Sequence, residues 1–263
     1  MSTIENSRQI LTNLQDGVLH LQLNRPEKRN ALTQAMYGGL GEAISRADKN
    51  GSVRVIFLTG SKDYFCAGND LKDFQKASNR TDDQRSQGSL FATAMMATNK
   101  PIVAAVAGMA IGIGTTMLLH CDLVYCSKSA QFSMPFINLG LCPEFGSSML
   151  LPMMAGHQRA AELLLLGEVF DAKKAQEVGI VSEIFPDHQL MEEAMKKAKK
   201  LAAKPPSAVR LTKSLMKLAN KEAVKEFMRI EGGHFKDRLT SPEAREAFAA
   251  FFEKRKPDFS RFE

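Results

Sequence analysis

The sequence predicts an α/β fold followed by a helical region, and two observations support this prediction. Strand-like and helix-like segments alternate along the N-terminal two thirds of the chain, as they do in α/β proteins. After Gly146, the periodic segments have helical spacing. The 263 residues, 44% of them hydrophobic and 24% charged, suffice for one large domain, or for one domain with a helical appendage.

Short runs near the N-terminus have the composition of β-strands, because they either alternate in polarity or are continuously apolar and β-branched. These runs are residues 19–23, 53–59, 101–106, 123–126 and 130–133. A helix is predicted over 33–48, where Met36, Leu40 and Ile44 share one face. The polar stretch 75–88, rich in Ser, Asp and Arg, predicts a mobile surface loop.

The later segments with helical periodicity have clear end signals. They are residues 160–167, 171–178, 189–203, 207–217, 221–237 and 241–254. Asp171 is a predicted N-cap, and Gly179 lies just past a predicted helix end. Ser241 and Pro242 fit an N-cap followed by a first-turn proline.

The net charge of +6 and the pI of about 9.1 are compatible with a nucleic acid or with a small polyanion such as a nucleotide-bearing cofactor. The basic residues are spread over predicted amphipathic helices, so solvated helix faces are the favoured interpretation. The absence of Trp and the presence of only three Tyr leave little to stack on nucleobases. We therefore expect no nucleic-acid partner.

Cys66, Cys121, Cys126 and Cys142 form no CxxC pair and have no histidines at zinc-like spacing. We expect reduced thiols, most of them buried, and no metal site. No apolar stretch is long enough to cross a bilayer, and the first fifteen residues lack the features of a targeting segment. The C-terminal sequence is not a Ser-Lys-Leu address. A cytoplasmic protein without a membrane partner is expected.

Two glycine-containing turns, residues 65–71 and 108–116, follow the two best predicted buried strands. Small residues let a ligand approach the backbone, and a helix start presents unpaired N–H groups that could form an oxyanion hole. Taken alone, each turn is better explained as a plain strand-to-helix connection. The second turn also departs from the dinucleotide-binding GxGxxG pattern, because Thr115, Thr116 and Met117 occupy its last part.

A third segment, residues 139–148, places the carboxylate of Glu144 among apolar and small residues where a helix is predicted to begin. Desolvation there would raise the pKa of Glu144 and make it a base near neutral pH. The same position fits equally well an acid in a first helical turn, stabilised by the helix dipole. The residues alone leave both interpretations open.

In these segments the sequence resembles the crotonase (enoyl-CoA hydratase/isomerase) superfamily, almost from end to end. The similar stretches are residues 24–32, 65–71, 101–122, 130–132, 138–152, 172–181 and 252–256. The resemblance implies a spiral of ββα repeats over residues 1–200 and a helical trimerisation region over 201–263. It also implies acyl-CoA thioester substrates, a homotrimer or dimer of trimers, and no separate cofactor, since coenzyme A is part of the substrate.

The resemblance implies that the backbone N–H groups of Asn69 and Ile113 polarise the thioester carbonyl. Asn69 directly follows the glycine of the first loop, whereas Ile113 replaces a glycine of the family's Gly-Gly-Gly run. Other residues implied in substrate binding are Ala67, Gly68, Asp70, Leu71, Gly112 and Phe136. Basic residues expected to screen the phosphates of coenzyme A, each modestly, are Arg25, Lys28, Lys72 and Lys254.

Departures from the family pattern favour one reaction. Thr116 and Phe136 stand at the positions of the two hydratase glutamates, and neither can activate water. Glu144 stands where the peroxisomal-type Δ3,Δ2-enoyl-CoA isomerases place their single catalytic glutamate. The resemblance therefore implies an isomerase of fatty-acid β-oxidation that moves a 3-enoyl-CoA double bond to the 2-trans position. Glu144 would take the C2 proton and return it at C4.

Several alternatives are retained. A related dehalogenase has an aspartate nucleophile at the position of Glu144, so hydrolysis through an ester is conceivable. A ring-opening or ring-expanding isomerase of aromatic catabolism, or a hydratase, belongs to the same class. A non-catalytic RNA-binding member would use the basic charge, but the oxyanion loops and Glu144 argue against it.

Overall fold

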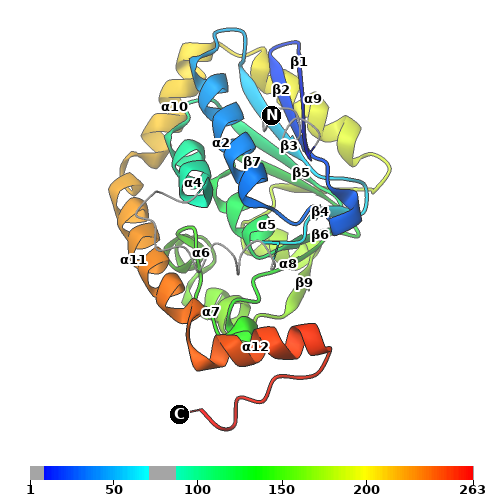
Figure 1. Cartoon of the computed structure of the whole chain (residues 1–263). Coiled ribbons are helices and arrows are strands. Elements are labelled where there is room, and N and C mark those ends of the chain that lie inside the picture. Colours follow the sequence, from blue (N-terminus) through cyan, green and yellow to red (C-terminus); the bar gives the residue numbers. More distant parts are fainter. Residues whose placement is uncertain (1–8, 71–86, 263) are drawn as a thin grey trace.

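A computed structural model describes residues 9–70 and 87–262 (Figure 1). Its larger sheet has six strands in the order β1-β2-β3-β5-β7-β10, in which only the β1–β2 pair is antiparallel. These strands are Ile10–Gln15, Val18–Leu23, Val55–Thr59, Ile102–Val106, Leu123–Ser127 and Glu183–Phe185. The smaller sheet has the order β4-β6-β8-β9, and only its β8–β9 pair is antiparallel. Its strands are Tyr64–Cys66, Met109–Ile111, Gln131–Ser133 and Val169–Asp171.

Successive strands alternate between the two sheets, which confirms the predicted spiral of ββα repeats. Strands β3, β5 and β7 lie in the larger sheet, and β4, β6 and β8, which follow them in the chain, lie in the smaller one. The three-residue strands were not predicted as such, apart from β8, because so short a run shows no period. As a result, the turns that follow β4 and β6 lie side by side at one edge of the smaller sheet.

The central strands β3 and β5 of the larger sheet are buried on both faces, which explains their continuously apolar sequences. All five residues of β3 are buried, and so are all five of β5. Ile56 and Leu58 join the main core with helices α2 (Gln34–Lys49) and α4 (Gln87–Ala97). Alternate residues such as Phe57 join a second core beneath α9 (Leu190–Ala202). Helix α2 begins as predicted, since the Thr33 side chain accepts a hydrogen bond from the Met36 N–H.

The predicted loop 75–88 is wrong at its end, because Gln87 and Gly88 already belong to α4. Helix α4 packs Phe91 and Met95 into the main core, and this tertiary contact outweighs the polar sequence of its first turn. The rest of that predicted loop lies outside the described residues. Helix α5 (Ile113–Thr116) is short, and a 3-10 helix, η2 (Met117–His120), continues it.

The predicted later helices are all present. They are α6 (Ser147–Ala155), α7 (His157–Leu166), α8 (Ala172–Glu177), α9, α10 (Pro206–Leu218), α11 (Lys221–Leu239) and α12 (Pro242–Glu253), with the short 3-10 helices η1 (Pro26–Lys28) and η3 (Ile137–Leu139) earlier in the chain. The Asp171 carboxylate accepts from the Lys174 N–H, and the Ser241 hydroxyl accepts from the Ala244 N–H, as predicted for N-caps. Gly179 has φ +83° just past the end of α8.

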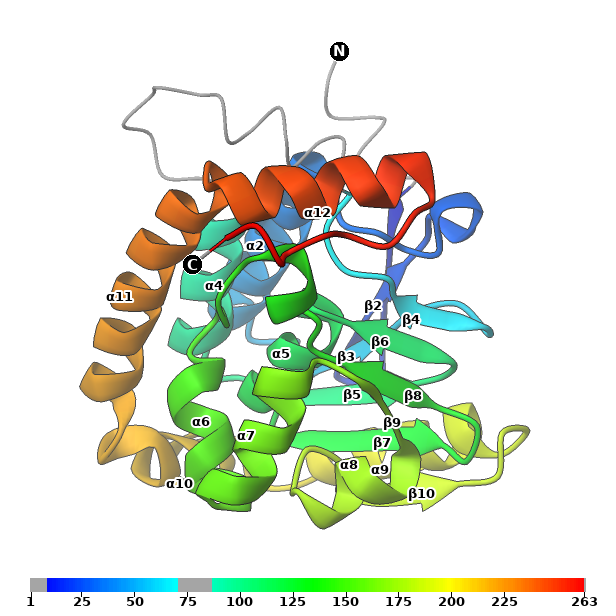
Figure 2. The same ribbon diagram turned by 90° about the horizontal axis from the view of Figure 1, so that it is seen from below.

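Helices α10, α11 and α12 follow one another along the outside of the molecule (Figure 1). The segment after α12 doubles back along that helix (Figure 2). Helix α10 is tied to the core by Lys213, whose Nζ donates to Asp122 Oδ2 and to the Lys100 carbonyl, both at 2.7 Å. The domain boundary near residue 200 stays a prediction, and α9, which ends at Ala202, packs on the sheet of the core.

Candidate active site

The first glycine loop follows β4 and is held by a short parallel bridge. The Leu32 N–H donates to the Gly68 carbonyl at 2.8 Å, and the Asp70 N–H donates to the Leu32 carbonyl at 2.9 Å. Gly68 has φ +93°, a conformation that favours glycine. Within the described part of the chain, the N–H of Asn69 between these two bonds has no hydrogen-bond acceptor. The loop therefore offers one free backbone donor.

The second glycine loop follows β6 and turns into helix α5. Gly112, with φ +56°, is the N-cap, and its own N–H donates to the Ser133 carbonyl at 2.9 Å. Ile113 is the first residue of α5, and the N–H groups of a first helical turn lack intrahelical partners. A Cβ added at Gly114 would lie 2.6 Å from the Cys66 carbonyl oxygen, so the two loops touch. Glycine is required there for close approach rather than for φ.

Glu144 meets the second loop directly. The Thr116 hydroxyl, in the same helical turn as Ile113, donates a short hydrogen bond to Glu144 Oε1. Glu144 lies before α6, which begins at Ser147, so the interpretation as a first-turn acid is wrong. Its carbonyl, rather than its carboxylate, joins the helix start, because it accepts from the N–H and the hydroxyl of Ser147.

The surroundings of Glu144 bring its pKa close to neutral pH. Burial raises the pKa of Glu144 to about 7, the hydrogen bond from Thr116 lowers it, and the negative charge of Glu231 raises it. A carboxyl with this pKa is an effective proton acceptor and donor at neutral pH. The predicted desolvation of Glu144 thus agrees with its environment in the fold.

The sequence analysis missed further polar side chains that support the site. The Tyr37 hydroxyl donates to Asn69 Oδ1 at 2.6 Å and so orients the side chain beside the first free N–H. His120 Nε2 lies 2.7 Å from the Phe145 carbonyl oxygen, and the two rings stack at 4.0 Å. Burial lowers the pKa of His120 to about 4, so this ring is neutral at pH 7. No local sequence signal marks these residues, because their partners are far along the chain.

The predicted substrate-binding residues of the loops lie around these donors. The Ala67 N–H donates to the Arg29 carbonyl at 3.0 Å, which holds the first loop. Phe136 is buried, and its Cε1 would lie 3.9 Å from a Cβ added at Gly112, so its ring packs beside the second loop. Leu71 and Lys72 lie outside the described residues.

The predicted phosphate-screening residues differ in their surroundings. Arg25 Nη1 donates to Asp70 Oδ2 at 2.7 Å and to the Ala31 carbonyl at 3.1 Å, and its side chain is only 14% exposed. Asp70 therefore compensates the Arg25 charge. Lys28, in η1, and Lys254, which ends α12, are both exposed.

Residues 9–70 and 87–262 contain no group of three His, Cys, Asp or Glu side chains that could hold a metal ion. In the same ranges, no helix combines the length and the apolar composition needed to span a membrane. Cys66, Cys121, Cys126 and Cys142 are free thiols. Burial raises the pKa of Cys66, beside the first loop, to about 12, so this thiol stays protonated at neutral pH.

Comparisons with known proteins agree with this geometry. Rat enoyl-CoA delta isomerase 2 is 35% identical over 94% of the chain, which spans 64% of that longer protein. Two Escherichia coli proteins, 2,3-dehydroadipyl-CoA hydratase and 1,2-epoxyphenylacetyl-CoA isomerase, are each 33% identical over 95% of the chain and 98% of their own length.

Solved structures show the same fold. The structure of an enoyl-CoA hydratase/isomerase from Pseudoalteromonas atlantica has a TM-score of 0.90 and 42% identity, and the match covers 95% of this chain and 99% of that one. Pseudomonas aeruginosa OdaA has a TM-score of 0.89 and 43% identity, covering 93% and 99%. The family model for enoyl-CoA hydratase/isomerase matches residues 13–261. This chain belongs to the enoyl-CoA hydratase/isomerase, or crotonase, family.

Proposed function

We propose that this chain is a Δ3,Δ2-enoyl-CoA isomerase, which moves the double bond of a 3-enoyl-CoA thioester to the 2-trans position. The observation that carries the proposal is the hydrogen bond from Thr116 to Glu144. It puts a carboxyl at helix α5, the helix that begins with the open N–H of Ile113. Two relatives, rat enoyl-CoA delta isomerase 2 and Escherichia coli 1,2-epoxyphenylacetyl-CoA isomerase, are named as isomerases, which supports an isomerase reaction.

The reaction needs one group that moves a proton and a pair of donors that hold a charge. The thioester carbonyl oxygen accepts from the N–H groups of Asn69 and Ile113. Ionised Glu144 removes a C2 proton, which is acidic because the thioester and the double bond both delocalise the resulting charge. The dienolate oxygen is stabilised by the two N–H groups. Protonated Glu144 then delivers the proton to C4, and the double bond is left between C2 and C3.

The pKa of about 7 at Glu144 suits both halves of this cycle. At neutral pH much of the carboxyl is ionised and ready to accept a proton, yet its conjugate acid is strong enough to return that proton at C4. Burial is the main cause, so the apolar surroundings of Glu144 are part of the catalyst.

Isomerisation is favoured over hydration by what surrounds this carboxyl. Hydration needs groups that position and activate a water as well as a group that protonates C2. Thr116, at one hydratase position, uses its hydroxyl proton on Glu144. Phe136, at the other, is a buried apolar ring. One relative is nevertheless named as a hydratase, so the reaction itself must be assayed.

We also propose a cytoplasmic homotrimer or dimer of trimers that acts in fatty-acid β-oxidation. Large apolar side chains that are exposed in the single chain support subunit contacts. They include Met153, Leu165, Leu166, Leu211, Leu215, Met216 and Leu218. Light scattering on the purified chain tests this assembly, and a monomer at micromolar concentration would contradict it.

The decisive assay compares two thioesters at equal concentration. We expect the enzyme to convert 3-hexenoyl-CoA to 2-trans-hexenoyl-CoA, and to hydrate crotonyl-CoA at least a hundredfold more slowly, on the scale of a missing general acid or base. Product identity is read by chromatography and mass, since hydration adds a water and isomerisation adds nothing. Fast hydration of crotonyl-CoA would overturn the assignment as an isomerase and leave the hydratase alternative.

A further inference from the structure

Glu231, on α11, reaches across to the start of α6, which lies beside it (Figure 1). Its Oε2 accepts from the Gly146 N–H at 2.6 Å, and its Oε1 accepts from the Ser148 N–H at 2.9 Å and from the Ser148 hydroxyl at 2.5 Å. Glu231 is only 6% exposed. Both oxygens are thus used as acceptors, which is the arrangement of an ionised carboxylate.

The need for this carboxylate follows from the sequence of the turn. The N-cap of α6 is Gly146, which has no side chain to accept from the first N–H groups of the helix. Glu231 supplies the missing acceptor from another helix, at a helix end that favours negative charge. A carboxylate 83 to 85 residues away in sequence therefore performs the capping of α6.

The same contacts fix the backbone that carries Glu144. Phe145 and Gly146 have φ +58° and +74°, two consecutive left-handed residues, of which Phe145 is disfavoured there. On one side of this turn, His120 Nε2 donates to the Phe145 carbonyl oxygen at 2.7 Å, and the His120 ring stacks on that of Phe145. Glu231 holds the other side through the Gly146 N–H. The turn is clamped directly after the catalytic carboxyl.

Glu231 also differs electrostatically from the other titratable groups around Glu144. These groups are Tyr37 on α2, Cys66 on the first loop, His120 on η2 and Cys142 on the same loop as Glu144. Burial raises the pKa of Tyr37, Cys66 and Cys142 and lowers that of His120, so all four are neutral at pH 7. Glu231 is the charged group among those that act on Glu144.

We propose that Glu231 is a positioning residue, which holds the Phe145–Gly146 turn that presents Glu144 and places a negative charge beside that carboxyl. The inference rests on the proposed function, because it takes Glu144 as the base. Its two effects are separable. Loss of the hydrogen bonds lets Glu144 drift from the substrate, whereas loss of the charge makes Glu144 easier to ionise.

The first experiment titrates Glu144 directly and needs no turnover. Carbon-13 NMR of the chain labelled at glutamate Cδ follows each carboxyl, and Glu144→Gln identifies the Glu144 resonance. In Glu231→Gln, which removes the charge but keeps the shape, we expect the midpoint of Glu144 to fall below that of the parent. In Glu231→Asp, which keeps the charge, we expect a midpoint closer to that of the parent. An unchanged midpoint in Glu231→Gln overturns the electrostatic part.

The second experiment measures kcat and KM for 3-hexenoyl-CoA across pH. Misplacement of a catalytic group costs roughly tenfold to a hundredfold in rate, so we expect kcat of Glu231→Gln to fall on that scale with KM nearly constant. The acid limb should move to lower pH, as in the titration. Ser148→Ala removes the hydroxyl that donates to Glu231 but keeps the Ser148 N–H and the charge of Glu231. It should therefore lower kcat slightly without moving the acid limb. Parent-like kcat in Glu231→Gln overturns the positional part.

The matched control is Glu226→Gln on the same helix, where the exposed carboxylate pairs with Arg229 at 2.6 Å. It should change neither the Glu144 midpoint nor kcat. If Glu231→Gln does not fold, Glu231→Asp carries the test, and full kcat there overturns the proposal. Failure of the proposed function is recognised differently: the parent then fails to isomerise 3-hexenoyl-CoA, while the NMR titration still tests Glu231.

Discussion

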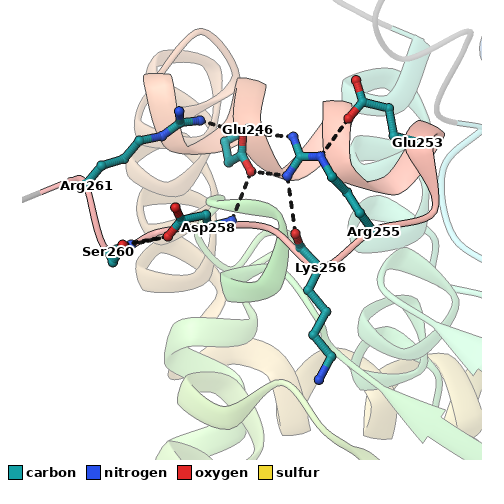
Figure 3. Close-up of polar contacts among 7 residues, drawn as sticks. All are labelled: Glu246, Glu253, Arg255, Lys256, Asp258, Ser260 and Arg261. Atoms are coloured by element: carbon teal, nitrogen blue, oxygen red, sulfur yellow. Dashed lines mark hydrogen bonds and ion pairs between the residues drawn. The ribbon is translucent and has the colours of Figure 1, made fainter.

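Glu144, which is half-buried, and Glu246, which is buried, show how partners decide what a carboxylate does. Glu246, on α12, has a side chain that is 5% exposed and accepts from Arg255 at 2.5 and 3.1 Å, from Arg261 at 2.6 Å and from the Asp258 N–H at 2.9 Å (Figure 3). The hydrogen bonds from Arg255 and from the Asp258 N–H, together with the charges of Arg255 and Arg261, lower the pKa of Glu246 to about 2. Glu144 accepts from the neutral hydroxyl of Thr116, and its pKa is about 7.

The difference in pKa separates a structural carboxylate, Glu246, from one that can exchange a proton near neutral pH, Glu144. Glu246 binds residues on the segment after α12, and Ser260 donates to Asp258 within that segment (Figure 3). Its charge is compensated, so it has no tendency to take a proton at neutral pH. Glu144 lacks a cationic partner among the described residues that act on it, and so it can change its protonation state.

The largest effect is expected when Glu144, the reactive carboxylate of the two, is replaced. Glu144→Gln keeps the size of the side chain and can still accept from Thr116, but it cannot take the C2 proton. Isomerase kcat should fall by about a thousandfold, the scale of a lost general base. Glu246→Gln serves as the matched control and should keep kcat. Robust turnover by Glu144→Gln would disprove the mechanism. With the parent enzyme, some of the deuterium placed at C2 of the substrate should appear at C4 of the product.

A second test concerns the backbone N–H groups of the two glycine loops, which remain open, whereas Arg255, Arg261 and the Asp258 N–H donate to Glu246. Ile113→Pro deletes one N–H at the first position of α5, where a helix tolerates proline. We expect kcat/KM to fall by roughly a hundredfold or more. Asn69→Ala keeps its N–H and should lose far less, and circular dichroism checks the fold of both variants. Equal losses would mean that the Asn69 side chain, rather than its N–H, acts on the substrate.

Local signals marked Glu144 and both glycine loops as candidates: a carboxylate among apolar residues, and glycines after buried strands. These signals alone left the roles open, and the resemblance to the crotonase superfamily supplied them. The sequence analysis did not find the partners. Thr116 is 28 residues from Glu144, and Ser148 is 83 residues from Glu231, so only the fold brings each pair together. The sequence analysis treated Thr116 only as the residue that stands at a hydratase glutamate position. In the structure its hydroxyl donates to Glu144.

Local patterns predicted the α/β architecture, whereas the spiral of ββα repeats was implied only by the resemblance to the crotonase superfamily. Buried five-residue strands such as β3 and β5 have a continuous apolar pattern. Strands β4, β6 and β9 have three residues each, too few for a period to emerge, and their pairing is set by the sheet into which they are drawn. The Glu246 cluster was not foreseen, since Arg255 and Arg261 read as ordinary surface bases.

A third prediction uses the opposite pH dependence of the two carboxylates. The pKa of Glu144 is raised from 4.5 to about 7 in the folded state, so its ionisation costs stability as pH rises through that window, by at most about 3 kcal/mol. Glu144→Gln should therefore melt at a higher temperature than the parent at pH 8 and at a similar temperature at pH 4.5. Calorimetry at both pH values measures this, and equal melting temperatures at pH 8 would contradict it.

Glu246 should behave in the reverse sense. Its pKa is lowered from 4.5 to about 2, so its contribution to stability is present above pH 4.5 and is lost as pH falls toward 2. Glu246→Gln should melt at a lower temperature than the parent at pH 7, and the gap should narrow on acidification. A gap that is independent of pH would mean that the side chain stabilises α12 by packing alone.

A smaller effect is expected at the hydrogen bond that Thr116 donates to the Glu144 carboxylate. Thr116 donates to this carboxylate and lowers its pKa, so Thr116→Val should raise the pKa of Glu144. The acid limb of kcat/KM should move to higher pH, and activity at pH 7 should fall several-fold, on the scale of one lost hydrogen bond to a charged group. Thr116→Ser should restore the parent profile. A limb that stays in place would show that the short contact does not persist in solution.

The smallest effect concerns basic side chains for which no ion pair with Glu144 or Glu246 is seen among the described residues. Arg25 resembles Arg255 in being compensated, because it pairs with Asp70, whereas Lys28 is exposed, and we expect it to screen the phosphates of coenzyme A. An exposed charge contributes little, so Lys28→Ala should raise KM by only about twofold and leave kcat unchanged. Added salt should raise KM of the parent more than that of the variant, because screening removes the same attraction. Lys49→Ala, at the exposed end of α2, is the matched control and should keep the salt response of the parent. If salt leaves the parent KM unchanged, electrostatic screening by these lysines is not part of substrate binding.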